Sequence, residues 1–191
     1  MDEKALTEVK KCLEVLRDGG VILYPTDTVW GLGCDATNSQ AVKRIFEIKR
    51  RADSKSLIAL VDSYPRMEAY VAEVPDIAWD LIEVTEKPLT IVYPKGRGLA
   101  PEMLAEDGSV GIRITQEPFS KALCAALRRP LVSTSANFSG QPSPACFAEI
   151  DAKLCNMVDY VADYRRQDRE KKQPSSIIKL EGNGNFVLIR E

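Results

Sequence analysis

The chain of 191 residues contains no histidine, and this absence removes several kinds of active site. A Ser-His-Asp triad and a Cys-His pair both need an imidazole as the base that activates the nucleophile. Histidine-based metal sites are excluded for the same reason. Any chemistry must therefore use lysine, arginine, carboxylates, hydroxyl groups, backbone amides or a metal ion that arrives with the substrate.

Other absences narrow the class of protein. No apolar run approaches the roughly 18 residues of a membrane span, so no membrane partner is expected. Residues 1–16 are charged and amphipathic, unlike a signal peptide. The cysteines number five, and no two have C-x-x-C spacing. We therefore expect free thiols in a reducing, cytoplasmic setting, and neither a disulfide framework nor a zinc site.

The composition is that of an ordinary globular protein, with 45% hydrophobic and 28% charged residues. A chain of this length buries roughly 70% of its unfolded surface, so we expect residues 1–191 to form a single domain without a disulfide or metal staple. The net charge of −2 argues against a nucleic-acid footprint over the whole domain. It leaves room for a local basic pocket.

Apolar runs alternate with amphipathic segments along the chain, which predicts an α/β domain. Strands are predicted at 21–24, 57–61, 89–93, 110–114, 131–135 and 158–161. Helices are predicted at 3–17, 38–49, 64–72, 76–84, 119–127 and 146–155. Segments 175–180 and 186–189 flank a glycine-rich turn and are expected to form a hairpin, which makes the sheet mixed.

The stretch 21–34, VILYPTDTVWGLGC, places polar groups directly after a predicted strand. Such an arrangement marks a site at the carboxyl end of the strand. Residues 31–36 also match G-x-G-x-x-A, the dinucleotide fingerprint, in their letters. Six residues, including Pro25, separate the strand from that motif, so an NAD enzyme is the least favoured hypothesis. The glycines are instead expected to let the backbone turn.

A basic cluster follows the second predicted helix and has two interpretations. Cations are common at the C-terminal end of a helix because they interact favourably with its dipole. Lys49, Arg51 and Lys55, however, cross the predicted helix end and can converge on one point, as a triphosphate requires.

Hydroxyl and amide side chains gather after the predicted strand 131–135. Ser133, Thr134, Ser135 and Asn137 give four hydrogen-bonding side chains within five residues, more than one cap or turn requires. Arg113 stands in an otherwise apolar strand, where an arginine must be paired or bind an anion.

These motifs, in this order, resemble those of the YrdC-like threonylcarbamoyl-AMP synthases over roughly residues 5 to 190. The matching pieces are Tyr24 to Cys34, Lys49-x-Arg51-x-x-x-Lys55, Pro88-Leu89-Thr90, Gly111 to Ile114, Ser133-Thr134-Ser135-Ala136-Asn137-x-Ser139-Gly140 and Pro174 to Ile177. The resemblance implies the short, single-domain form of the family. It also implies a twisted mixed parallel and antiparallel sheet flanked by helices, with a concave basic cavity.

The resemblance implies that L-threonine, bicarbonate and ATP give threonylcarbamoyl-AMP and pyrophosphate. A tRNA-modifying transferase complex then passes the threonylcarbamoyl group to an adenosine of tRNA. Mg²⁺ is expected to arrive with ATP and not at a protein metal site, and Asp27 is the one candidate protein ligand. The alternative is a non-catalytic module that binds tRNA or double-stranded RNA in the same basic cavity.

The resemblance also assigns roles to residues. The catalytic and phosphate-binding cations are Lys49, Arg51 and Lys55. The other ATP-binding residues are Arg113, Ser133, Ser135, Asn137, Ser175 and Ser176, and the threonine-binding residues are Tyr24, Thr26 and Thr28. The chain departs from many members at 85–87, where Thr-Glu-Lys replaces Trp-Pro-Gly, and at Leu60, where long-form members have a histidine. The presence of Ala136-Asn137 favours the active branch of the family.

Overall fold

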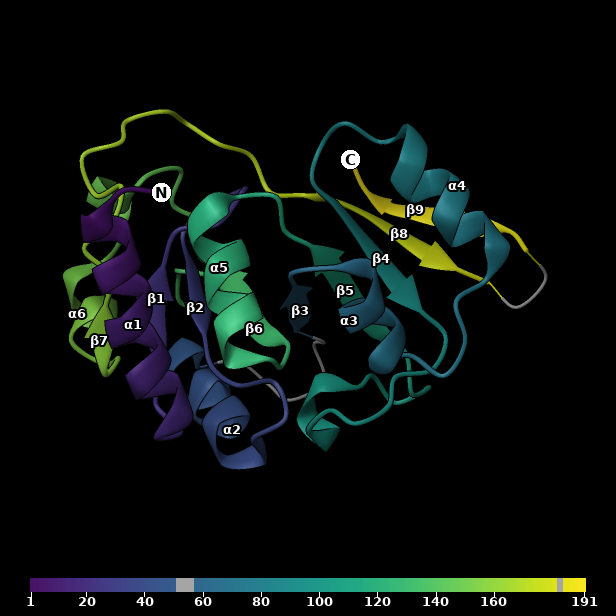
Figure 1. Ribbon diagram of the computed structural model, residues 1–191, viewed down its shortest axis with the longest axis horizontal. Coiled ribbons are helices and arrows are strands. Elements are labelled where there is room, and N and C mark those ends of the chain that lie inside the picture. Colours follow the sequence, from purple (N-terminus) through teal and green to yellow (C-terminus); the bar gives the residue numbers. More distant parts are fainter. Residues whose placement is uncertain (51–56, 182–183) are drawn as a thin grey trace.

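A mixed sheet with helices on both faces organises the computed structural model, which describes residues 1–50, 57–181 and 184–191 (Figure 1). Nine strands in these residues follow the order β7-β1-β2-β6-β3-β5-β4-β8-β9. The pairs β1–β7, β3–β5 and β4–β8 are parallel, and the other neighbours are antiparallel. The predicted mixed α/β sheet flanked by helices is thereby confirmed.

The strands are short, as the predicted apolar runs required. They are β1 (Ile22–Tyr24), β2 (Gly31–Gly33), β3 (Ile58–Val61), β4 (Leu89–Tyr93), β5 (Val110–Ile114), β6 (Leu131–Ser135), β7 (Tyr160–Val161), β8 (Ser176–Leu180) and β9 (Phe186–Arg190). The helices are α1 (Glu3–Arg17), α2 (Ser39–Lys49), α3 (Tyr64–Ala69), α4 (Asp76–Val84), α5 (Pro118–Leu127) and α6 (Ala152–Cys155). Two 3₁₀ turns, Pro101–Met103 and Phe147–Glu149, complete the set.

Side-chain caps fix the beginnings of the helices that flank the sheet. The Asp2 carboxylate accepts a hydrogen bond of 2.8 Å from the backbone N–H of Ala5 and so begins α1. The Asn38 amide oxygen accepts from the N–H groups of residues 40 and 41 and begins α2. Helix α2 ends at Arg50, whose left-handed backbone (φ 51°) turns the chain away. Both helices lie where the sequence predicted them.

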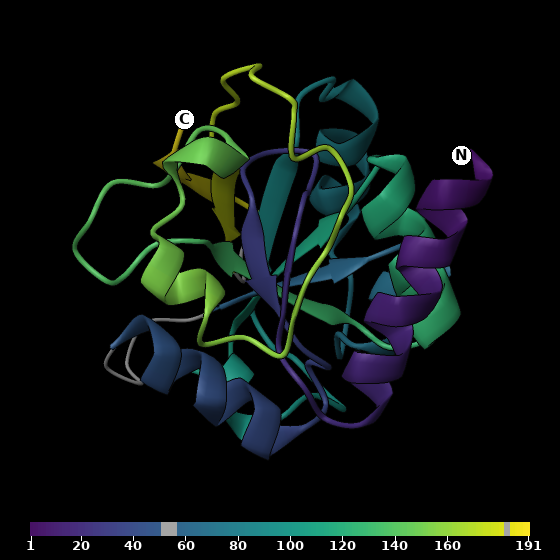
Figure 2. The ribbon, with the colours of Figure 1, turned by 90° about the vertical axis from the view of Figure 1, so that its left-hand side faces the viewer.

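The two faces of the sheet have separate hydrophobic cores. On one face α1 packs against α5, and Cys12, Leu16 and Phe119 meet Tyr24 and Leu60 of the strands. On the other face α2, α3 and α4 lie over the sheet, and their apolar side chains form the larger core. Figure 2 shows α1 and α5 together on one side of the strands and α2 on the other. The sheet therefore lies between two hydrophobic cores.

The structure corrects two predictions made from the sequence. Residues 146–155 do not form one helix, because Asp151 caps a new helix (α6) by accepting from the N–H of Lys153 after a separate 3₁₀ turn. Gly31 and Gly33 do not make a turn, because they form β2, between β1 and β6. A side chain at Gly33 would place its Cβ 2.5 Å from the Tyr24 ring. Glycine is present there because the neighbouring strand approaches closely.

Residues 162–175 connect the two ends of the sheet by crossing over the top of the molecule in Figure 1. This segment leads from β7 at one sheet edge to β8 near the other. No helix among the described residues is long and apolar enough to cross a membrane.

Candidate functional site

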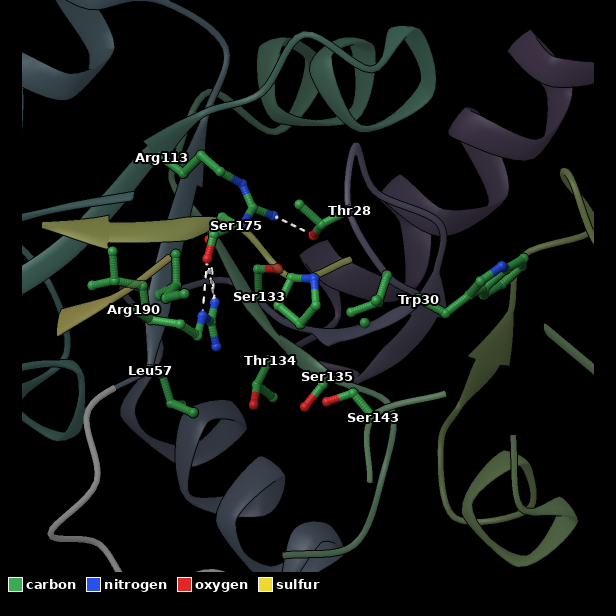
Figure 3. A pocket seen from close by; sticks show the side chains of 15 residues that line it. Thr28, Trp30, Leu57, Arg113, Ser133, Thr134, Ser135, Ser143, Ser175 and Arg190 are labelled. Atoms are coloured by element: carbon green, nitrogen blue, oxygen red, sulfur yellow. Dashed lines mark hydrogen bonds between the residues drawn. The ribbon is translucent and has the colours of Figure 1, made fainter. Parts of the chain in front are cut away.

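A polar cavity of about 210 Å³ opens on the sheet face that carries α1 and α5. We call it the arginine–serine cavity, after Arg113, Arg190 and the serines that line it (Figure 3). Its walls are formed by Thr28, Val29, Trp30, Gly31, Leu57, Ile58, Arg113, Ser133, Thr134, Ser135, Ser143, Pro174, Ser175, Ile177 and Arg190. Five residues predicted for the site, Thr28, Arg113, Ser133, Ser135 and Ser175, therefore meet in one cavity.

Arg113 is the most deeply placed cation of this cavity, with 3% of its side chain exposed. Its Nη2 donates to Thr28 Oγ1 over 3.3 Å and forms an ion pair with Asp27 Oδ1 over 3.1 Å. Its Nε is buried and has no hydrogen-bond partner among the described residues. A buried guanidinium with an unused donor is suited to bind an anion, since an unmade hydrogen bond at this depth is costly.

Arg190, on the edge strand β9, is a second cavity cation that the sequence analysis missed. Its Nε and Nη2 donate to the backbone carbonyl of Ser175 over 2.9 and 2.7 Å. Burial and the nearby positive charge of Arg113 both lower the pKa of Arg190. An anion between the two guanidinium groups would relieve that repulsion. The one signal in the sequence was an arginine that ends the apolar run Phe186 to Ile189.

The hydroxyl groups reach the cavity from two strands and a loop. On β6, Ser133 and Ser135 point to the same face because side chains alternate along a strand. Ser175 precedes β8, and its Oγ lies 2.9 Å from Thr90 Oγ1. The cavity also receives Thr134 and Ser143, neither of which had been assigned a role. Hydroxyls both donate and accept, so these walls suit a phosphate and a ribose or an amino acid equally.

Lys49 does not line the arginine–serine cavity; its ammonium group binds the segment that follows β6. Lys49 Nζ donates to the backbone carbonyl of Ser135, to that of Asn137 over 2.8 Å and to Asn137 Oδ1 over 3.4 Å. The Ser139 N–H in turn donates to the Lys49 carbonyl over 2.9 Å. In this structure Lys49 therefore fixes the position of Ser135, and its predicted contact with phosphate stays a prediction.

Asn137 has a similar internal role. Its Oδ1 accepts from Ser135 Oγ over 2.5 Å, and its Nδ2 donates to the carbonyls of Phe138 (3.1 Å) and Gln141 (2.6 Å). The amide thus shapes the turn that leaves β6. Asn137 is not among the residues that line the arginine–serine cavity, and its predicted contact with the nucleotide stays a prediction.

Of the three residues predicted to bind threonine, one lines the arginine–serine cavity and the other two are buried beside it without lining it. Thr28 lines the cavity, whereas Thr26 is buried and bonds Val29 O (2.8 Å) and Thr28 Oγ1 (3.0 Å). Tyr24 is fully buried in the core under α1 and α5, and its hydroxyl donates to the Val132 carbonyl over 3.1 Å. Burial raises the pKa of Tyr24 well above its usual value. Tyr24 therefore supports β6 from within instead of lining the cavity.

Three further predictions concern Arg51 and Lys55, Ser176, and Asp27. Arg51 and Lys55 lie outside the described residues. Ser176 lines a neighbouring pocket that it shares with Lys87 and Lys172. Asp27, the candidate ligand for Mg²⁺, is paired with Arg113, and the described part of the chain has no group of three or more cysteine, aspartate or glutamate residues placed to hold a metal ion.

Comparison with known proteins gives consistent results over most of the chain. The family model Sua5_yciO_yrdC, described as "Telomere recombination", matches residues 14–191. A threonylcarbamoyl-AMP synthase of Pseudoalteromonas translucida is 36% identical over 158 residues, which are 81% of this chain and 84% of that protein. The corresponding Vibrio cholerae synthase is 36% identical over 169 residues, 86% of this chain and 90% of that protein.

Solved structures show the same fold. Escherichia coli YciO superimposes with a TM-score of 0.85 at 26% identity, and the match covers 100% of this chain and 91% of that one. P. abyssi Sua5, solved in complex with L-threonine, gives a TM-score of 0.84 at 29% identity and covers 95% of this chain. The chain spans about half the length of Sua5, 53%.

Proposed function

The chain belongs to the Sua5, YciO and YrdC family, and from that premise we propose that it is a threonylcarbamoyl-AMP synthase. The products are threonylcarbamoyl-AMP and pyrophosphate, made from L-threonine, bicarbonate and ATP. One observation supports this activity most directly. Buried Arg113, together with Arg190 of the edge strand β9, faces a set of hydroxyl groups in one cavity, and Arg113 and most of those hydroxyl groups come from the motifs that resemble those of the synthases.

The chemistry requires positioning and charge stabilisation more than a strong base. The threonine amine attacks carbon dioxide, formed from bicarbonate, and loses a proton to give a carbamate. A carbamate oxygen then attacks the α-phosphorus of ATP, and the bond to the bridging oxygen breaks as pyrophosphate leaves. Bringing the reactants together and stabilising the charge on phosphorus account for most of the catalysis in reactions of this type. A histidine-free site is sufficient for both tasks.

Each element of the arginine–serine cavity has a place in this reaction. We assign the phosphate charge to Arg113 and Arg190, because their guanidinium groups are close enough for one to lower the pKa of the other. Thr28 and the serines of β6 hold the hydroxyl and amine groups of the substrates. Mg²⁺ arrives with the ATP phosphates, because this ion keeps several of its waters and usually binds through substrate phosphates.

Pyrophosphate release from ATP tests this function. We expect release only when L-threonine and bicarbonate are both present, with serine and valine as matched controls that lack the methyl group or the hydroxyl of threonine. Detection of threonylcarbamoyl-AMP by mass spectrometry identifies the product. Release at the same rate without threonine would contradict the proposal.

The RNA-binding alternative would draw on the basic cluster around residues 43–55 and on a second charged segment, residues 164–172, in which the structure pairs two of the arginines internally. Arg165 is paired with Asp168 over 2.6 Å, and Arg166 donates to the carbonyls of Val161 and Ala162. These guanidinium groups are used within the protein. A gel shift with tRNA tests the alternative, which requires tight, salt-dependent binding without ATP turnover. Transfer of the product to tRNA by a partner complex is part of our proposal and needs no RNA site on this chain.

A further inference from the structure

Thr90, on β4, is a buried residue to which the proposed reaction assigns no role. Its Oγ1 lies 2.9 Å from Ser175 Oγ, and this hydrogen bond joins β4 to the segment that precedes β8. Thr90 is 0% exposed and does not line the arginine–serine cavity, whereas Ser175 does. Thr90 therefore lies behind the wall of the cavity, in contact with one of its lining residues.

The alternation of side chains along β4 directs Thr90 toward the face of the sheet that carries the arginine–serine cavity. Its neighbours Leu89 and Ile91 line a second pocket on the opposite face, against α3 and α4. In the antiparallel pair of β4 with β5, Ile91 is the Cα partner of Ile112. One step further in the same register Thr90 lies beside Arg113, so its hydroxyl is placed between the two strands that carry the site.

The shape of threonine suits this position. Its hydroxyl meets Ser175, and its γ-methyl carbon is 3.4 Å from the place that a Cβ would occupy at Gly111 of β5. The methyl group thus packs over a residue that has no side chain. Rotation about χ1 is restricted in a β-branched side chain. The hydroxyl of Thr90 is therefore held in one direction, toward Ser175.

Ser175 in turn binds Arg190. The Nε and Nη2 groups of Arg190 donate to the carbonyl of Ser175 over 2.9 and 2.7 Å, and Nη2 lies 3.4 Å from Ser175 Oγ (Figure 3). Arg190 belongs to β9, an edge strand that pairs with β8 alone among the described strands. An arginine side chain has many rotamers, so the bonds to Ser175 determine where its guanidinium group lies.

We infer that Thr90 is a positioning residue of the arginine–serine cavity: its hydroxyl holds Ser175, and Ser175 holds the guanidinium group of Arg190 toward the substrate phosphates. The inference rests on the proposed function, because it takes the phosphates of ATP as the ligand of Arg190. Thr90 itself touches no substrate. Loss of its hydroxyl therefore lowers the affinity for ATP and leaves the reaction of the bound substrates nearly unchanged.

Pyrophosphate-release kinetics of Thr90→Val test the inference, because valine keeps the branched shape and removes the hydroxyl. We expect the KM for ATP to rise about fivefold, the effect of one lost hydrogen bond, with kcat within about twofold of the wild-type value. Thr90→Ser retains the hydroxyl and should restore the KM to near that of the wild type. An unchanged KM in folded Thr90→Val, or in Thr90→Ala if the valine variant does not fold, overturns the inference.

Thr115 offers a matched control for the loss of a buried hydroxyl. Its Oγ1 lies 2.8 Å from Ser120 Oγ, and both residues are 0% exposed and do not line the arginine–serine cavity. We expect Thr115→Val to lower the melting temperature about as much as Thr90→Val does and to leave the KM for ATP unchanged. An equal rise in KM in Thr115→Val would show that lost stability alone weakens ATP binding, and the inference would fail.

A double variant shows whether Thr90 acts through Arg190. In Arg190→Gln the guanidinium group that Thr90 positions is absent. We expect the addition of Thr90→Val to Arg190→Gln to raise the KM for ATP no further, because both changes remove the same contact. Effects on KM that multiply would show that Thr90 acts independently of Arg190 and would refute the inference.

Nuclear magnetic resonance of the Arg190 side chain gives a readout that needs no catalysis. The Nε–H group that donates to the Ser175 carbonyl has a resonance that is assigned by its loss in Arg190→Gln. We expect this resonance to shift in Thr90→Val and to stay in place in Thr115→Val. If the wild-type protein releases no pyrophosphate, the proposed function fails, and the resonance still tests the link from Thr90 to Arg190. A resonance that is the same in Thr90→Val as in the wild type overturns that link.

Discussion

The regions around β6 and around β5 and β9 both bring cations toward the arginine–serine cavity, but they use them differently. At β6, Lys49 is 2% exposed and its ammonium group donates to oxygens of residues 135 and 137, so it stabilises a protein segment. At β5 and β9, Arg113 retains a buried donor without a partner among the described residues, and Arg190 faces it from the sheet edge. In the first region the Lys49 ammonium donates to protein oxygens. In the second region the Nε donor of Arg113 can still bind an anion.

This difference shows that a positive charge in a sequence motif does not by itself define a ligand contact. Lysine, with three donors on a flexible stem, can satisfy three protein oxygens at once. Arginine has five donors in a rigid plane, so some of them remain available after it has paired with a carboxylate. We therefore expect substitutions at Arg113 and Arg190 to act on substrate, and substitutions at Lys49 to act through the position of the segment after β6.

The largest effect should follow from Arg113→Ala. Removal of one well-placed charge donor costs roughly 100- to 1,000-fold in rate, so we expect a loss of that size in pyrophosphate release. Arg66→Ala is the matched control, because Arg66 is a partly buried arginine paired with an aspartate outside the cavity. Steady-state kinetics measure both variants, and melting curves establish that each is folded. Equal activity of the two variants would remove Arg113 from the site.

Lys49→Met should have a smaller and different effect. The methionine keeps an apolar stem but leaves buried carbonyl oxygens unsatisfied, which costs about 1–3 kcal/mol of unfolding free energy. Lys43→Met is the control, since Lys43 is exposed on the same helix and pairs with Glu102. Urea unfolding measures the difference between them. If Lys49→Met kept full stability but lost ATP binding, Lys49 would be a phosphate ligand and the contrast between the two regions would fail.

Arg190→Gln should weaken ATP binding but have little effect on the rate at which the bound substrates react. Loss of one charge-assisted hydrogen bond, about 1.5 kcal/mol, raises the KM for ATP about tenfold and leaves kcat nearly unchanged. Lys179→Gln, on the same hairpin, is the control because Lys179 is exposed and pairs with Asp107. A tenfold change in KM for threonine, with none for ATP, would assign Arg190 to the other substrate.

The smallest effects are expected from two glycine substitutions, one in β2 and one in β5. Their changes in unfolding free energy compare how tightly the two strands are packed. Gly33→Ala in β2 places a Cβ 2.9 Å from the Val132 carbonyl oxygen and closer still to Tyr24, so we expect a loss of about 1–3 kcal/mol of unfolding free energy. Gly111→Ala in β5 meets Thr90 at 3.4 Å, and a change within about 0.5 kcal/mol is expected. Similar losses at both positions would show that β2 is not packed more tightly than β5.

Much of the fold was predictable from the sequence. Helices α1 and α2 have clear periodicity and a capping residue each, and β4, β5, β6 and the β8–β9 hairpin are apolar runs that end at turn residues. Strand β2 was missed because glycines, which disfavour strands in general, are required there by close approach of Tyr24. That requirement comes from another strand and cannot be seen in a local pattern.

The sequence predicted which residues belong to the site better than it predicted how they are arranged. Thr28, Arg113, Ser133, Ser135 and Ser175 were named from the sequence and meet in one cavity, although their individual roles stay predictions. Arg190 was missed because only the pairing of β9 with β8 brings it beside Ser175. The internal bonds of Lys49 and Asn137 depend on the path of the chain after β6, which composition and spacing do not determine.

A crystal structure of the protein with ATP and L-threonine bound tests the central claim most directly. We predict that the ATP phosphates contact the guanidinium groups of Arg113 and Arg190, with the Lys49 ammonium still on the carbonyls of Ser135 and Asn137. Phosphates bound by Lys49, with its bonds to those carbonyls broken and both arginines turned away, would contradict it.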